Sequence, residues 1–290
     1  MTTKTGDFGQ TQGNARNALL ALARCEDSEA FIRFATGLAK RLGLALDYIQ
    51  GCNEPPASPA ECFAIGPAAC ADVLDLRGAR IEQATAVARR NFDAAVAQIG
   101  LAARWTAVSD LYAEDEVWRR AQNAAFVLLS RPKPPHTAQS LVEDILLRIV
   151  APVLIVPPAP AQTITFSRIL CAWDGSSQAR RALNASMPLL RRASTVELVQ
   201  VGASAAGQAP GDSLDAIADE LATDGIKVEA VCLDRESAGI AATLLERYAQ
   251  SHSELLVMGA YRHRRLREQI LGGVTRTMLE RADIPILLAH

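Results

Sequence analysis

Residues 168–201, RILCAWDGSSQARRALNASMPLLRRASTVELVQV, set out one strand–helix–strand unit. The segments RILCAW (168–173) and TVELVQV (195–201) are apolar runs of strand length, and residues 177–192 between them are expected to form a helix. Apolar strands that alternate with amphipathic helices are typical of a parallel sheet covered on both faces. This stretch therefore predicts an α/β fold.

The same alternation continues to the end of the chain. After residue 201 the pattern predicts helices over 212–223, 238–250 and 273–281, and strands over 227–233, 254–258 and 284–289. The first half has the same order of elements. Its expected strands are 18–23, 44–49, 101–108, 125–130 and 152–156, and its expected helices are 27–42, 72–99, 115–123 and 140–150.

The ends of the two halves match most closely. LRIVAPVLIV (147–156) aligns with ERADIPILLA (280–289), so that Pro152 and Pro285 coincide just inside a terminal apolar strand. The repeat predicts three regions: a polar flexible tail over 1–16, a first domain over 17–158 and a second domain over 166–290. The segment PPAPAQT (157–163) between the domains is expected to be a linker. Right-handed crossovers would make each half a doubly wound, five-stranded parallel sheet.

Composition excludes several classes of protein. A length of 290 residues fits two domains, and a net charge of −2 with 5% aromatic residues argues against a general nucleic-acid binder. No apolar run is long enough to cross a bilayer, and the polar N-terminus does not resemble a secretion signal, so we expect a cytoplasmic protein. The six cysteines are scattered without a CxxC pair, which predicts reduced thiols and no metal site.

Two segments of the second half carry candidate ligand chemistry. In doubly wound sheets ligands bind beyond the carboxyl ends of the strands, and Asp174 follows the first strand of this half. Asp174 could be a turn residue that satisfies backbone amides, or an acceptor for nucleoside hydroxyl or amino groups. The pair Gly272–Gly273 precedes a helix, where it could be a plain turn or could bring amide groups and the helix dipole to phosphate oxygens.

Arginine is concentrated in the loop before this glycine pair. The run RHRRLR (262–267) could be a solvated loop face or could attract ATP phosphates or another polyanion. No histidine has partners at the spacing of a metal site or a catalytic triad, and the sequence predicts no catalytic residue.

The string MGAYRHRRLREQILGGVT (258–275), preceded by CAWDGS (171–176), resembles the universal stress protein family. ATP-binding members of that family carry Gly, two residues, Gly, nine residues, then Gly and Ser or Thr. In this chain the first glycine is Gly259 and the third is Gly272. Arg262 stands at the second glycine position and Gly273 at the Ser/Thr position, with Thr275 two residues further on.

The resemblance implies an adenine nucleotide, ATP with or without Mg²⁺, in the second domain. Asp174 would meet the base or ribose, Val201 would line the adenine pocket, and Met258 and Gly259 would flank the nucleoside. The phosphates would be held by the start of the last helix, with Arg262 adding positive charge. The residues implied there are Gly272, Gly273, Val274 and Thr275.

The first domain departs from this pattern. Cys25 aligns with Asp174, and Gln139 and Ser140 fall where Gly272 and Gly273 fall, so we expect no nucleotide in this domain. Members of the family pair through the last strand. The resemblance therefore implies that residues 152–156 and 284–289 meet antiparallel, as an intramolecular pseudo-dimer, with a homodimer of the chain left open.

Three functional hypotheses follow. The first is a tandem universal stress protein that binds ATP in its second domain and acts as a stress-response regulator with an unidentified protein partner. The second is a slow ATPase that uses the same site with Mg²⁺. The third is an interaction or scaffold protein of the same fold that binds no nucleotide.

Overall fold

The computed structural model describes residues 17–24, 29–51, 63–108, 115–131, 145–146, 148–160, 165–202, 212–235, 237–260 and 273–289. The chain divides into two compact units, Met1–Ser130 and Arg131–His290. Across the described ranges no helix is both long and apolar enough to cross a membrane. The expected tail over 1–16 lies outside the described residues, as does most of the helix expected over 140–150.

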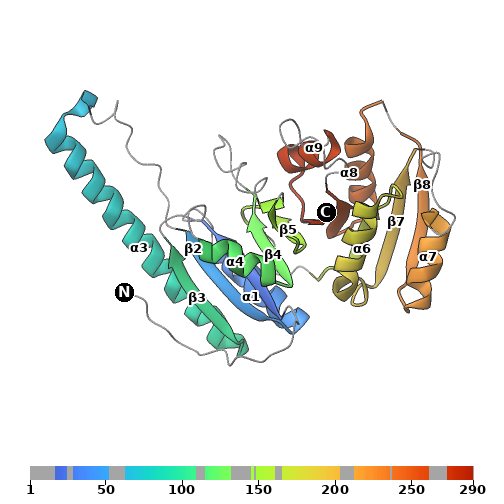
Figure 1. The fold of residues 1–290 in the computed structure, drawn as a ribbon, viewed down its shortest axis with the longest axis horizontal. Helices are drawn as coiled ribbons and strands as arrows, with labels where there is room; N and C mark the ends of the chain where they lie inside the picture. The colour runs from blue at the N-terminus through green and yellow to red at the C-terminus, as the bar shows by residue number, and fades with distance from the viewer. Residues whose placement is uncertain are drawn as a thin grey trace. The chain divides into compact units, whose positions relative to one another are not determined.

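The first unit contains four parallel strands in the order β3-β2-β1-β4 (Figure 1). The strands are β1 (Ala18–Ala23), β2 (Ala45–Gly51), β3 (Ala103–Val108) and β4 (Phe126–Ser130). The connecting helices are α1 (Glu29–Leu42), α3 (Pro67–Ile99) and α4 (Asp115–Asn123). Each of these strands and helices matches a sequence expectation to within a few residues.

Amphipathic spacing explains how α1 covers this sheet. Phe31, Phe34, Ala35 and Leu38 recur on one helical face and are all buried, as expected from their spacing. Beyond α1, the Tyr48 ring stacks on Trp105 with their centroids 4.9 Å apart. The core of the first unit is thus an apolar layer between the sheet and its helices.

The second unit repeats this strand order. Five parallel strands run in the order β10-β9-β6-β7-β8. They are β6 (Arg168–Ala172), β7 (Thr195–Val201), β8 (Val228–Leu233), β9 (Leu255–Gly259) and β10 (Ile286–Ala289). The helices are α6 (Ser177–Leu190), α7 (Leu214–Thr223), α8 (Ile240–Gln250) and α9 (Gly273–Arg281).

The terminal strands of the two repeats pair with each other. β5 (Val153–Val156), the last strand of the first repeat, lies in the second unit and runs antiparallel to β10. Leu154 is opposite Leu287, and both side chains are buried. The expected antiparallel pairing of these two strands is therefore confirmed.

The predicted α/β fold class, with two tandem doubly wound repeats, is confirmed by this strand order. The domain limits 17–158 and 166–290 stay a prediction. The expectation of reduced cysteines is wrong for Cys70, which is disulfide-bonded. Scattered spacing does not reveal such a pairing, because a disulfide needs only that the fold bring two cysteines together.

Candidate functional site

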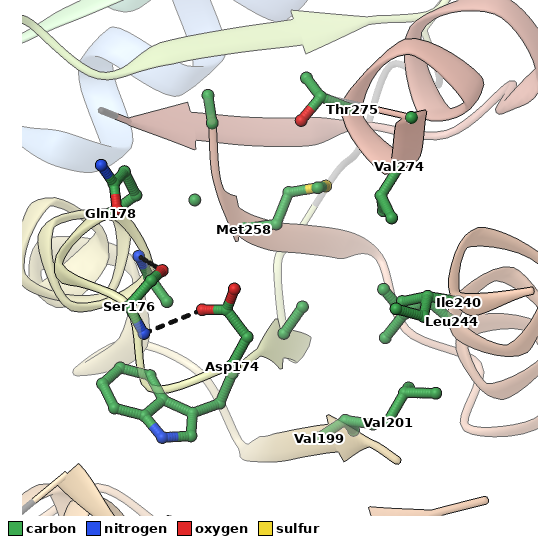
Figure 2. Close-up of a pocket in the computed structure, with 16 residues that line it drawn as sticks. Asp174, Ser176, Gln178, Val199, Val201, Ile240, Leu244, Met258, Val274 and Thr275 are labelled. Atoms are coloured by element: carbon green, nitrogen blue, oxygen red, sulfur yellow. Dashed lines mark hydrogen bonds between the residues drawn. The ribbon is translucent and has the colours of Figure 1, made fainter. Parts of the chain in front are cut away.

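A pocket of about 260 Å³ opens where β6, β7 and β9 end (Figure 2). In the strand order of the second unit, β7 and β8 lie on one side of β6, whereas β9 and β10 lie on the other. The chain therefore reverses its winding direction between β6 and β9, and the loops that leave these two strands diverge. The pocket occupies this switch point.

The sequence predicted nine residues for this site. Seven of them are described, and all seven line the pocket: Asp174, Val201, Met258, Gly259, Gly273, Val274 and Thr275. Arg262 and Gly272 lie outside the described residues. The fold thus brings together segments that are far apart in the sequence.

The turn between β6 and α6 presents Asp174 to the pocket. The Ser176 amide donates a hydrogen bond to Oδ1 of Asp174 at 3.0 Å, and Gly175 adopts the left-handed conformation with φ of 72°. Ser176 then caps α6, because its hydroxyl accepts a hydrogen bond from the Ala179 amide at 3.1 Å. Of the two roles left open for Asp174, that of a turn residue that satisfies a backbone amide is confirmed. Its carboxylate also points into the pocket (Figure 2), whereas a contact with a ligand stays a prediction.

One wall of the pocket is apolar. Val199 and Val201 end β7, Ile240 and Leu244 face them from α8, and Met258 comes from β9 (Figure 2). Val199, Leu244 and Met258 are at most 5% exposed. Such a wall excludes water from the flat face of an aromatic ligand.

Three members of this wall were not predicted from the sequence. Val199 could have been found, because alternate residues of a strand share one face and Val201 was already assigned. Ile240 and Leu244 have the i, i+4 spacing of one helical face. That spacing, however, does not say which strand the helix covers.

The start of α9 forms the opposite side of the pocket. Gly273 begins the helix, no acidic residue occupies its first turn, and a Cβ on Gly273 would meet no atom within 4 Å. Thr275 is only 4% exposed although its side chain lines the pocket. Amide groups of a first helical turn and the helix dipole favour an anion at such a place.

Gly259 has a packing role that cannot be inferred from the family motif. A Cβ at Gly259 would lie 2.6 Å from the Ala179 amide nitrogen and 2.7 Å from the carbonyl carbon of Gln178. Both contacts are with backbone, so no rotamer change relieves them. Glycine at this position lets the end of β9 approach the first turn of α6.

The corresponding edge of the first unit has different side chains at the ends of its strands. Arg24 follows β1 directly, and its Nη2 donates a hydrogen bond to the Ser130 hydroxyl at the end of β4 at 3.1 Å. A side-chain bridge thus joins the two strands that correspond to β6 and β9. Cys25, Gln139 and Ser140, which were aligned with the ligand residues of the second domain, lie outside the described residues.

These features define a doubly wound α/β protein with a pocket at the switch point of its second sheet. Residues 165–290 match the model of the universal stress protein family. The universal stress protein Slr1230 of Synechocystis is 30% identical over 151 residues, which cover 49% of this chain and 48% of the relative. The matched region is thus about half the length of that curated relative.

Solved structures extend the similarity in fold to the whole chain. A universal stress protein from Archaeoglobus fulgidus matches with a TM-score of 0.64 and 18% identity, covering 96% of this chain and 99% of that one. A structure from Pseudomonas aeruginosa UCBPP-PA14, assigned to the same family, matches with a TM-score of 0.57 and 13% identity over 95% of this chain and 94% of its own. The chain therefore has a tandem universal stress protein fold.

Proposed function

We propose that this protein binds an adenine nucleotide in the pocket of its second unit and acts as a nucleotide-responsive stress regulator. The observation that carries this proposal is the layout of the pocket. The apolar wall, a carboxylate and a helix N-terminus line one cavity. A nucleotide has the same three parts: a flat apolar base, a sugar with hydroxyl donors, and anionic phosphates.

The base is assigned to the apolar wall of the pocket. A purine against Val201 and Leu244 would bury apolar area, which contributes about 25 cal/mol per Å². Asp174 accepts hydrogen bonds in its ionised form, so it can bind ribose hydroxyl or base amino groups. The Ser176 amide already fixes the direction of this carboxylate.

The phosphates are assigned to the start of α9. The open space beside Gly273 allows an anion to approach the helix backbone without a side chain in the way. Thr275 adds a hydroxyl from the same turn. Within the described lining the only charged side chain is that of Asp174, so positive charge for the phosphates is assigned to the helix dipole and to Arg262.

The remaining parts of the proposal come from the sequence and the family. The first unit binds no nucleotide in this mode, the protein resides in the cytoplasm, and its partner is another protein. Hydrolysis would need a group that orients the attacking water, and Mg²⁺. Because the sequence predicts no catalytic residue that would fill this role, we propose binding rather than catalysis as the main activity.

Nucleotide content tests the proposal. The purified full chain is denatured, and the supernatant is analysed for adenine nucleotide before and after incubation with ATP. Intact ATP supports the regulator, whereas ADP that accumulates with turnover supports the ATPase. No bound nucleotide, and no affinity at millimolar ATP, would support the scaffold alternative.

A matched pair of variants tests the phosphate assignment. Gly273→Ala adds a methyl group beside the proposed phosphates, and Gly37→Ala adds one to α1, where a Cβ also meets no atom within 4 Å. Gly273→Ala is expected to weaken ATP binding several-fold, and Gly37→Ala to leave it unchanged. Equal affinities would place the phosphates elsewhere.

A further inference from the structure

A cluster of four side chains lies directly behind the Asp174 turn. Trp173 precedes Asp174 and is only 3% exposed, and its indole Nε1 donates a hydrogen bond to the Asp212 carbonyl at 3.0 Å. The guanidinium of Arg180 lies over the Trp173 ring, 5.5 Å from the centroid. Its Nη2 donates to Oδ1 of Asp212 at 2.8 Å, and Nη1 pairs with Glu220.

This cluster connects three elements that the backbone leaves separate. Trp173 continues β6 and donates its amide to the Val199 carbonyl at 2.8 Å, Arg180 lies in the first turns of α6, and Asp212 precedes α7. The hydrogen bond to Asp212 raises the pKa of Arg180, so the cluster keeps its positive member. Arg180 therefore contacts the Trp173 ring and also Asp212, the residue whose carbonyl accepts the Trp173 indole hydrogen bond.

We propose that Arg180 is a positioning residue for the ligand site. Through its position over the Trp173 ring and its bond to Asp212, Arg180 fixes the turn from Trp173 to Ser176 and so holds the Asp174 carboxylate in the pocket. The inference rests on the proposed function, in which Asp174 contacts the nucleoside. A site whose contact groups are held by supporting side chains loses less entropy when it binds.

Arginine has the properties that this role requires. Its planar guanidinium can stack on an indole ring while it donates in-plane hydrogen bonds to two carboxylates. A lysine would keep the charge but would lose the planar stack and the forked donors. Arg180→Lys therefore tests whether the positive charge alone is enough to position the turn.

The chain offers a matched control on the same two helices. Arg191, at the end of α6, pairs with Asp224, at the end of α7, at 3.2 Å. This ion pair also joins α6 to α7, but at the helix ends away from the Asp174 turn. Arg191→Ala removes an inter-helix ion pair without touching Trp173.

The decisive experiment measures ATP affinity by titration of the full-length wild type, Arg180→Ala, Arg180→Lys and Arg191→Ala. Both Arg180 variants are expected to bind about three- to tenfold more weakly, and Arg191→Ala to bind like the wild type. In an Asp174→Ala background, Arg180→Ala is expected to cause no further loss. An unchanged affinity in Arg180→Ala, or the same loss with and without Asp174, overturns the inference.

A second readout needs no ligand. Hydrogen exchange of the Ser176 amide, followed by NMR, reports whether its bond to Asp174 is held. Faster exchange in Arg180→Ala than in Arg191→Ala supports the inference, and equal rates contradict it. If the wild type binds no ATP, the proposed function fails and this exchange measurement alone decides the role of Arg180.

Discussion

The end of β9 and the first turn of α6 meet at Gly259 and Ala179, where a Cβ on Gly259 would lie 2.6 Å from the Ala179 amide nitrogen. This contact brings Met258 on β9 and Ser176 at the cap of α6 to the same pocket. The close approach of two backbones therefore shapes the site before any ligand enters it.

Gly259→Ala is expected to destabilise the protein by about 1–3 kcal/mol, because the added methyl group overlaps backbone atoms that can move only together with α6. The urea unfolding midpoint measures this loss. Gly37→Ala serves as the control, since its methyl group meets open space. Equal midpoints for the two variants would contradict the close approach.

The pairing of β5 with β10 predicts coupling between Leu154 and Leu287. Leu154→Ala and Leu287→Ala are each expected to cost about 2–5 kcal/mol, since both side chains are at most 1% exposed. The double variant should deviate from additivity by more than about 0.5 kcal/mol, because the two side chains are direct cross-strand neighbours.

Leu198 supplies the control for this double-mutant cycle. It is buried on β7, with β10, β9 and β6 between it and β5. Unfolding free energies of Leu154→Ala and Leu198→Ala are expected to add. Coupling of the same size in both cycles would mean that the measured effect does not come from strand pairing.

Cys171 predicts a loss of stability at alkaline pH. Burial raises the pKa of this thiol, so the folded state keeps the proton at a pH where the unfolded chain releases it. Stability is therefore fully present below the unfolded pKa and falls as the pH rises above it. From about pH 8 to about pH 10 the wild type should lose roughly 1.4 kcal/mol more than Cys171→Ala. Parallel pH profiles in urea unfolding would refute this.

Local sequence signals predicted the strands and helices well. The apolar run Ala18–Ala23 and the helix Asp115–Asn123 were found with the observed limits. The start of α7 was placed too early, because Asp212 precedes the cap Ser213, whose hydroxyl accepts from the Ala216 amide. Such errors arise where several polar residues in a row could cap the helix.

The candidate site was predictable only in part. Asp174 follows a strand and Gly273 begins a helix. In an α/β fold, both positions are typical of ligand-facing residues. Ile240, Leu244 and the Arg180 cluster depend on how helices pack on the sheet, which local periodicity does not encode. The packing role of Gly259 was hidden as well, since a motif glycine is first assigned to the ligand.

Titration of the full-length wild type with ATP, alongside Val201→Trp, tests whether the pocket of the second unit binds a nucleotide, the claim on which the site assignments depend. We expect one ATP per chain and at least about tenfold weaker binding in Val201→Trp, because the indole fills the space beside the apolar wall that is assigned to the base. Val228→Trp on β8, outside the pocket lining, should bind like the wild type. Absence of saturable binding in the wild type, or unchanged affinity in Val201→Trp, would contradict the claim.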